Sequence, residues 1–202
     1  MTPTLRVAIL AFDEVEALDL AGPYEVFTTA SRLRRREAPD APPPFAVACV
    51  ARERRPVRLR AGLQVLPDHV FDDAPPPDLL VVPGGVTDAA EACAATRAWI
   101  ARADATAQIT ASVCTGAFLL AASGVLTQGA VTTHWEDHAE LARRYPALQV
   151  QADRRWVDQG RLVTSGGISA GIDMSLHLVE RLAGAALAER TARQMEFQWT
   201  RG

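Results

Sequence analysis

One cysteine, Cys114, stands where a nucleophile could be positioned for chemistry. It lies in the segment 112–116 (Ser-Val-Cys-Thr-Gly), between the apolar run 109–113 and the apolar stretch 117–122. A strand that leads into a helix through small residues exposes the side chain at the turn, as in a nucleophile elbow. A thiol at a helix N-terminus meets the helix dipole and unpaired N–H groups, which lower its pKa. The residues alone leave a second interpretation open, an inert cysteine buried between apolar segments.

Two further loops that follow apolar runs and contain small residues could supply polar groups to the same place. Gly84 and Gly85 follow the run 78–82, and Gly166 follows the run 162–164. Small residues let a ligand approach the backbone closely, and their N–H groups can bind an anion. The same glycines could equally form simple tight turns.

An acidic residue in the first loop, Asp19, could accept or donate a proton. It lies in the segment 16–23, which leads into a helical pattern. An Asp before a helix is also a common cap, and from the residues alone the cap is the better-supported interpretation. His134 and His138 are four residues apart and could face one metal ion. Neither an HExxH pattern nor a third ligand accompanies them, so we predict no metal.

These candidates need a fold that brings them together. Continuous apolar runs predict strands covered on both faces at 5–12, 45–51, 78–82, 109–113 and 162–164. Helices are predicted at 24–33, 89–103, 115–122, 135–144, 172–182 and 186–199, a surface connection at 32–44, and a hairpin around Gly62 over 57–66. This alternation predicts an α/β fold, a flavodoxin-like doubly wound parallel sheet sandwiched between helices, with a small β-hairpin. Ligands bind such folds at the carboxyl ends of the strands, where the candidate loops lie.

Composition limits the possible classes of protein. The 202 residues, 49% hydrophobic with a formal charge of −3, predict one globular domain over 1–202 with a full core. The charge lacks the basic excess that nucleic-acid readers and polybasic membrane surfaces use, so we expect neither partner. No apolar stretch reaches the roughly 18 to 20 residues of a membrane span. With three cysteines and no secretory signal pattern, we expect a cytoplasmic protein with reduced thiols.

Four motifs together resemble one known superfamily. They are 83–85 (Pro-Gly-Gly), 112–117 (Ser-Val-Cys-Thr-Gly-Ala), 132–135 (Thr-Thr-His-Trp) and 166–173 (Gly-Gly-Ile-Ser-Ala-Gly-Ile-Asp). The chain resembles the ThiJ/PfpI superfamily, which has the class I glutamine amidotransferase-like fold, from Arg6 to Gln198. Within it, the segment 18–23 (Leu-Asp-Leu-Ala-Gly-Pro) together with Cys114 and the following Thr resembles the isonitrile hydratases. The same motifs resemble the sensor domains of AraC-type regulators.

The resemblance to the hydratases implies a chemistry for the site. Cys114 would be the nucleophile, Asp19 its acid/base partner and Thr115 a hydroxyl in the same pocket. Attack on an isonitrile carbon with protonation there would give a thioimidate, which water converts to an N-substituted formamide without metal or organic cofactor. Burial and the nearby thiolate would raise the pKa of Asp19 and keep it protonated. The N–H groups of Gly85 and Thr115 are the expected anion donors.

The remaining expectations concern the pocket wall and the departures from other subfamilies. Gly84, Gly166, His134 and Trp135 are expected to contact the substrate. The protease-like members carry His where Thr115 stands, and no late His-x-Glu of the glutaminase members is evident. The members related to the parkinsonism-associated protein carry a Glu in the first loop and a His at the spacing of His134. Here His134 matches the spacing but Asp19 replaces the Glu, so His134 is expected to contact the pocket without acting as a base.

Other classes of function stay open. The chain could be a small-molecule sensing domain like those of AraC-type regulators, or a cysteine-dependent amidase, carbonyl-repair enzyme or redox sensor. We expect the enzyme rather than the regulator, because 202 residues leave no room for a DNA-binding module. The resemblance favours a homodimer. Cys49 in a strand and Cys93 in an Ala-rich helix are expected to be structural.

Overall fold

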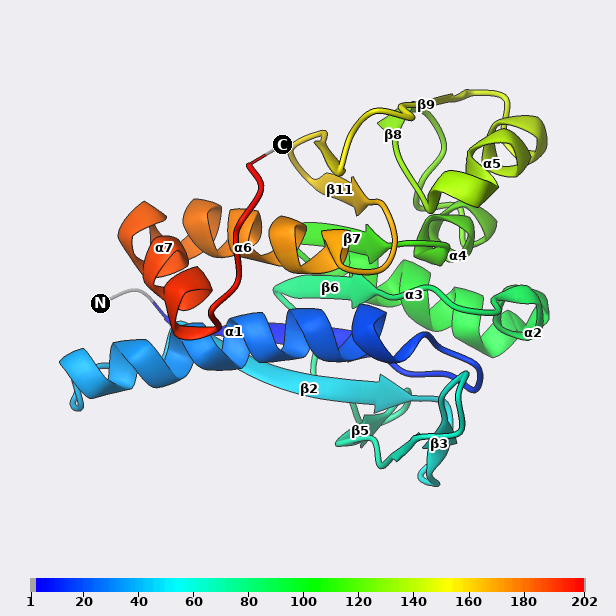
Figure 1. Cartoon of the computed structure of the whole chain (residues 1–202). Coiled ribbons are helices and arrows are strands. Elements are labelled where there is room, and N and C mark those ends of the chain that lie inside the picture. Colours follow the sequence, from blue (N-terminus) through cyan, green and yellow to red (C-terminus); the bar gives the residue numbers. More distant parts are fainter. Residues whose placement is uncertain (1–2, 202) are drawn as a thin grey trace.

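A mostly parallel sheet organises residues 3–201, which the computed structural model describes (Figure 1). Its strands are β1 (Leu5–Leu10), β2 (Phe45–Ala51), β5 (His69–Val70), β6 (Leu79–Val82), β7 (Ile109–Val113), β10 (Trp156–Asp158) and β11 (Leu162–Ser165). They pair in the order β10-β11-β7-β6-β1-β2-β5. Only β10 runs antiparallel to its neighbour. The arrowheads of β2, β6 and β7 therefore point to one edge, and the loops that follow them meet there.

Helices cover both faces of the sheet because its strands are apolar on both sides. On one face lie α1 (Ala17–Glu37), α6 (Ala170–Ala183) and α7 (Ala185–Gln194), and on the other α2 (Asp88–Ala92), α3 (Ala94–Thr106) and α4 (Gly116–Ala122). Val7 and Ile9 of β1 pack into the first core, whereas Ala8 and Leu10 pack into the second. This alternation explains the continuous apolar run and confirms the doubly wound class. No helix within residues 3–201 combines the length and apolar character that a bilayer crossing requires.

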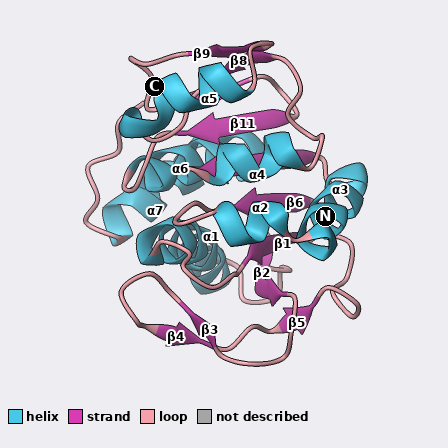
Figure 2. Cartoon of the chain, turned by 90° about the vertical axis from the view of Figure 1, so that its right-hand side faces the viewer, coloured by secondary structure: helices cyan, strands magenta, loops and turns pink. Residues whose placement is uncertain are grey.

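Two small sheets lie at opposite ends of the molecule (Figure 2). The antiparallel hairpin of β3 (Val57–Arg58) and β4 (Gln64–Val65) turns around Gly62, as predicted. The other sheet pairs β8 (Gly129–Val131) in parallel with β9 (Leu148–Val150). A 3₁₀ turn, η1 (Trp135–Asp137), and helix α5 (His138–Arg144) connect those two strands. The helix expected over 135–144 thus begins as a 3₁₀ turn.

The first helix is longer than predicted at both ends. It begins at Ala17, contains Pro23, and continues through 34–36 to Glu37, so the expected surface connection starts only after that residue. A proline inside a helix removes one backbone hydrogen bond. The buried face, which includes Val26 and Phe27, packs on the sheet and outweighs that loss. The arginines of the last turn also lie at the negative end of the helix dipole.

Two other helical predictions are wrong in their boundaries. The expected helix over 89–103 is two helices, because Cys93 adopts extended backbone (φ −74°, ψ 109°) between them. The C-terminal helix ends at Gln194 rather than 199. The residues beyond it dock on α6 instead: Thr200 N–H donates to Asp173 Oδ1 (2.7 Å) and Trp199 Nε1 to its carbonyl (3.2 Å).

We predict that Asp173 is a main contributor to stability. Its side chain is fully buried and accepts hydrogen bonds from Arg155 Nε (2.6 Å) and the Thr200 N–H. Asp173→Ala should lower the free energy of unfolding by about 2 to 4 kcal/mol, because it leaves a guanidinium and an N–H without their acceptor. Urea unfolding measures the change. The exposed Asp40→Ala is the control, and equal losses in the two variants would contradict the prediction.

Candidate active site

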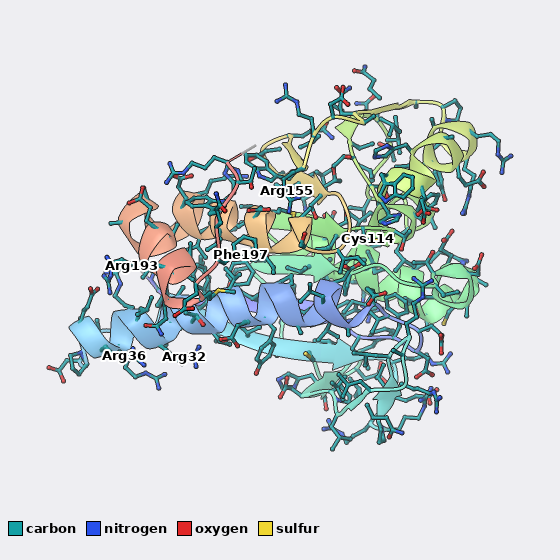
Figure 3. All side chains as sticks on the ribbon, viewed as in Figure 1. Arg32, Arg36, Cys114, Arg155, Arg193 and Phe197 are labelled. Atoms are coloured by element: carbon teal, nitrogen blue, oxygen red, sulfur yellow. The ribbon has the colours of Figure 1, made fainter. Side chains whose placement is uncertain are left out.

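Cys114 occupies the tight turn between β7 and α4, at the carboxyl-terminal edge of the sheet (Figure 3). Its φ of 57° lies in the left-handed region that non-glycine residues rarely adopt. Three hydrogen bonds hold this conformation. The Cys114 N–H donates to the carbonyls of Ser165 (3.1 Å) and Gly166 (3.3 Å), and its own carbonyl accepts from Thr133 Oγ1 (2.8 Å). The turn has the elbow geometry predicted from the sequence. Because these hydrogen bonds stabilise it, the strained backbone conformation of Cys114 persists in the folded protein.

Gly84 and Gly167 have no side chain and so leave space around Cys114. A Cβ added at Gly84 would lie 2.4 Å from Thr115 Oγ1 and 3.0 Å from Cys114 Cβ. A Cβ added at Gly167 would lie 2.8 Å from Cys114 Sγ and 2.5 Å from His134 Cδ2. Real Cβ atoms do not approach other atoms so closely, so a side chain at either position would clash with the residues around the Cys114 turn. The small residues of these loops therefore leave space around Cys114 in addition to forming turns.

Asp19 is buried behind Cys114 and does not cap its helix. The carboxylate of Glu16 accepts from the Ala17 N–H (3.2 Å) at the start of α1, so Glu16 is the cap. Asp19 points inward from the first turn, where Oδ2 accepts from the Gly84 N–H (3.1 Å). Its Oδ1 has no hydrogen-bond partner among residues 3–201. That oxygen is free to hold a proton beside the thiol.

Burial shifts the pKa values of the pair upward. Desolvation raises the pKa of Asp19 to about 7, against the opposing effects of the Gly84 N–H and the Cys114 thiol. Desolvation and the Asp19 charge raise the pKa of Cys114 to about 12, although the Thr115 N–H and hydroxyl oppose them. The expectation of a lowered thiol pKa is therefore wrong, because burial outweighs the N-terminus of a short helix. At pH values well above the Asp19 pKa and below that of Cys114, the pair holds one proton, mainly on sulfur.

Thr115 and Gly85 bond to each other at the cavity wall. The Gly85 N–H donates to Thr115 Oγ1 (2.8 Å), and this hydroxyl donates to the Gly85 carbonyl (2.9 Å). The Gly85 N–H is thus already engaged and is not an open anion donor. The Thr115 N–H points to the Cys114 sulfur instead. Of the two donors expected from the sequence, only the second faces the reacting atom.

A cavity of about 400 Å³ opens above Cys114. Gly85, Thr115 and His134 are among the other residues that line it, whereas Asp19, Gly84, Gly166 and Trp135 are not. Gly84 and Gly166 instead bond to Asp19 and to the Cys114 N–H. Trp135 is 72% exposed, and its ring lies 5.8 Å from that of His134. Among the predicted residues, Gly85, Thr115 and His134 thus line the cavity, whereas Gly84 and Gly166 hold Asp19 and Cys114 in place behind it. Trp135 lies beside the cavity lining, next to His134.

The two histidines face different partners. His134 lines the cavity, and its Nδ1 lies 3.4 Å from Asp137 and 3.7 Å from Glu136. His138 Nε2 lies 3.1 Å from the Thr133 carbonyl. They do not converge on one point. Within the described residues no group of three or more His, Cys, Asp or Glu side chains has the arrangement of a metal site.

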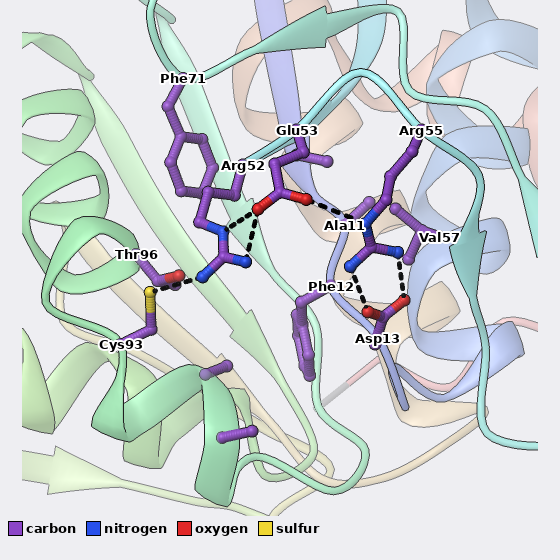
Figure 4. A pocket seen from close by; sticks show the side chains of 13 residues that line it. Ala11, Phe12, Asp13, Arg52, Glu53, Arg55, Val57, Phe71, Cys93 and Thr96 are labelled. Atoms are coloured by element: carbon purple, nitrogen blue, oxygen red, sulfur yellow. Dashed lines mark hydrogen bonds and ion pairs between the residues drawn. The ribbon is translucent and has the colours of Figure 1, made fainter.

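The other two cysteines differ sharply from each other. Cys49 is buried in β2, and desolvation raises its pKa to about 12. Cys93 lies at the junction of α2 and α3, where the hydroxyl and N–H of Thr96 lower its pKa to about 7. Arg52 donates to its sulfur (3.5 Å) beside a separate cavity of about 150 Å³ (Figure 4). The structural interpretation of Cys93 missed this helix start. Thr96, three residues later, is the signal that could have located it.

We predict that Cys93 is the thiol most readily alkylated near neutral pH. Iodoacetamide at about pH 7.5 should modify Cys93 before Cys49 and Cys114, because only this thiol is largely ionised there. A time course followed by peptide mass spectrometry measures the order of modification. Cys93→Ser should remove the fast phase. Modification of Cys114 first would contradict the prediction.

Known proteins resemble this chain in sequence over most of its length. It is 35% identical to isonitrile hydratase of Pseudomonas putida over 194 residues, which cover 96% of this chain and 78% of that relative. It is 28% identical to the HTH-type transcriptional regulator GbdR of Pseudomonas aeruginosa, across 90% of this chain but only 48% of the regulator. Enzyme and regulator relatives thus share this domain.

Solved structures share the fold. A ThiJ/PfpI family protein from Pseudomonas syringae superposes with a TM-score of 0.85 at 28% identity, covering 99% of this chain and 78% of its own. Drosophila melanogaster DJ-1beta superposes with a TM-score of 0.81 at 18% identity, covering 98% of this chain and 100% of its own. The second likeness shows the fold alone. A family model, DJ-1/PfpI, matches residues 5–181. With the parallel sheet and the cysteine elbow already described, this match shows that the chain belongs to the DJ-1/PfpI family.

Proposed function

We propose that this chain is a cofactor-independent lyase of the isonitrile hydratase type, which adds water to an isonitrile to give an N-substituted formamide. The observation that carries the proposal is the buried pair of Asp19, with a pKa of about 7, and Cys114 at a strained elbow. Such a pair can move one proton between sulfur and carboxylate next to a bound substrate. The 35% identity to an enzyme named isonitrile hydratase supports the assignment.

In the first step, the Cys114 proton passes to Asp19 and the thiolate attacks the isonitrile carbon. Asp19 delivers the proton to the same carbon. One C–S bond and one C–H bond form, the carbon–nitrogen triple bond becomes a double bond, and Asp19 returns to carboxylate. The product is a thioimidate bound to Cys114, and the Thr115 N–H faces the sulfur during this change.

In the second step, water adds to the thioimidate carbon. Asp19 takes a proton from the water and passes it to the nitrogen. The tetrahedral intermediate then collapses: the C–S bond breaks, the new hydroxyl becomes the formyl carbonyl, and its proton returns to sulfur through Asp19. One water is consumed, one formamide is released, and the pair regains its single proton.

The remaining site residues have supporting roles in this proposal. The Gly84 N–H orients the carboxyl through Asp19 Oδ2, and the Gly166 carbonyl holds the elbow through the Cys114 N–H. Thr115 and Gly85 form the wall. His134 and Trp135 stand at the rim, where they contact the body of the substrate. The homodimer and the cytoplasmic location stay predictions from the sequence.

A second candidate function is a sensing domain that binds a small molecule without turnover. The 28% identity to GbdR favours it, and this chain spans about half of that regulator. A sensor would retain the cavity but have no need of a proton shared between Asp19 and Cys114. Turnover therefore separates the two candidates.

We predict that the purified protein converts 4-methylphenyl isonitrile to its formamide, measured by chromatography. Cys114→Ala should abolish turnover, because no nucleophile remains, and Asp19→Asn should lower kcat by about 10²- to 10⁴-fold because proton transfer is lost. Cys93→Ser, outside the cavity, is the control with full activity. Saturable binding of the isonitrile without turnover by the intact, folded protein would instead establish the sensor.

The pH dependence of that reaction follows from the shared proton. Below the Asp19 pKa of about 7, both groups are protonated and no base can take the thiol proton. The value of kcat/KM should therefore rise with pH through about 7 and level off above it, as the carboxyl loses its own proton. Rate profiles between about pH 5 and pH 9 measure it. A rate that falls with pH in this range would contradict the assignment of Asp19.

A further inference from the structure

We propose that the cavity above Cys114 selects isonitriles whose far end carries a cationic group, such as a primary ammonium, and discriminates against anionic ones. This inference rests on the proposed function for the reacting group but concerns the rest of the substrate. Its basis is the set of charged side chains around the cavity mouth and how they are paired. The apolar side chains of the wall and the buried carboxyl of Asp19 give the substrate its orientation.

Acidic side chains outnumber basic ones around this cavity. Among the lining residues are two arginines, Arg60 and Arg144, and six acids: Glu16, Asp88, Glu91, Glu136, Asp137 and Glu140. The chain as a whole has a formal charge of only −3, with nearly equal numbers of basic and acidic residues. The excess of acidic over basic side chains is therefore local to the cavity wall and does not follow from the composition of the whole chain.

The two arginines of the wall are already neutralised by neighbouring acids. Arg60 lies 3.6 Å from Glu16. Arg144 pairs with Glu91, whose side chain is only 10% exposed, and its guanidinium also lies 5.1 Å from the centre of the Phe118 ring. Both cations are thus matched one to one and leave no positive charge free to attract an anionic substrate.

Three acids of the wall have no arginine partner within ion-pair distance in the part of the chain that the structure describes. They are Asp88, at the start of α2, and Glu136 and Asp137, in the turn η1. Glu136 and Asp137 face His134 Nδ1 (3.7 and 3.4 Å). A fourth acid, Glu140, pairs with Arg143, which is not part of the wall. A cation bound at the mouth would therefore meet carboxylates from two separate segments of the wall.

Apolar side chains lie between the mouth and the sulfur. Val86 is 42% exposed and Ile168 is 38% exposed, and both line the cavity together with the buried ring of Phe118. Exposed aliphatic side chains in a concave site bind the apolar body of a ligand. The cavity of about 400 Å³ has room for a substituted aryl or alkyl chain. The substrate would then have an apolar middle and a charged far end.

The buried end of the site fixes which way the substrate lies. Asp19 is fully buried, and its Oδ1 has no hydrogen-bond partner within residues 3–201. This unpartnered oxygen beside Cys114 marks where the reacting carbon must receive its proton. With the isonitrile carbon at the sulfur, the opposite end of the ligand points to the mouth and its acids. Charges near a protein surface interact at a high effective dielectric constant, so the expected preference is moderate and is screened by salt.

The test compares three isonitriles of matched size. Phenyl isonitriles with a para aminomethyl, ethyl or carboxymethyl group place a positive, neutral or negative charge at the far end, insulated from the reacting group by a methylene. We expect kcat/KM to fall in that order, by at least about tenfold between cation and anion at low salt. The ratio should shrink at high salt. Equal values, or a preference for the anion, would overturn the inference.

Variants of the rim identify the residues responsible. Asp88→Asn and Glu136→Gln each remove one acid without changing side-chain shape, so each should lower the cation-to-anion ratio of kcat/KM by about two- to fivefold. Glu189→Gln removes the same charge from exposed helix α7, far from the cavity wall, and is the matched control. An unchanged ratio in both rim variants, or an equal fall in the control, would contradict the assignment.

A second measurement does not depend on turnover. In Cys93→Ser protein, Cys114 is treated with a cationic trimethylammonium-ethyl or an anionic sulfonato-ethyl methanethiosulfonate, and its labelled peptide is quantified. The cationic-to-anionic rate ratio should exceed that of a free thiol and fall in Glu136→Gln. If no isonitrile is converted but this ratio holds, the proposed function fails and the cation-selective cavity stands. If the neutral isonitrile is converted and neither ratio shows a cation preference, only the charge selectivity fails.

Discussion

The burial of one carboxyl group against one thiol is the constraint on which the site depends. A fully buried carboxylate is costly unless it finds donors, and within residues 3–201 Asp19 Oδ2 accepts a hydrogen bond from the Gly84 N–H while Oδ1 has no partner. Desolvation therefore raises the pKa of Asp19 to about 7, because the Gly84 N–H and the Cys114 thiol oppose it only in part. The start of α1, the bare backbone at Gly84 and the strained turn at Cys114 all serve to keep these two groups together.

Two cysteines in this chain lie near helix starts, Cys93 at the cap of α3 and Cys114 one residue before the cap of α4, and yet their thiol pKa values shift in opposite directions. Cys93 precedes the longer helix α3 at an exposed junction, and hydrogen bonds from Thr96 lower its pKa. Cys114 precedes α4 beside a buried acid, and its pKa is raised. The helix N-terminus is common to both, so desolvation and the neighbouring charge decide the direction. The proposed reaction would therefore need a base to take the Cys114 proton, whereas the lowered pKa of Cys93 leaves its thiol largely ionised near neutral pH.

The parallel sheet explains why distant segments share one site. Because β6, β7 and β11 run side by side in the same direction, the loops at 83–85, 112–116 and 165–167 meet at one edge. The proposed reaction passes each of its protons through the carboxyl group of Asp19. The acids that line the cavity lie outside the strands of the sheet, and the proposed substrate selectivity depends on them.

The sequence by itself determined the main parallel strands, the doubly wound class and the elbow at Cys114, because apolar runs and small-residue turns are local signals. The residues alone favoured a helix cap for Asp19, and its pairing with Cys114 was implied only by the family resemblance. The sequence did not determine that α1 begins at Ala17, that Cys93 breaks a helix, or that the Gly85 N–H is occupied by Thr115. Nor could it show the direction of the Cys114 pKa or the unpaired acids at the mouth. Those properties depend on burial and on distances between residues far apart in the chain, and only the tertiary structure sets them.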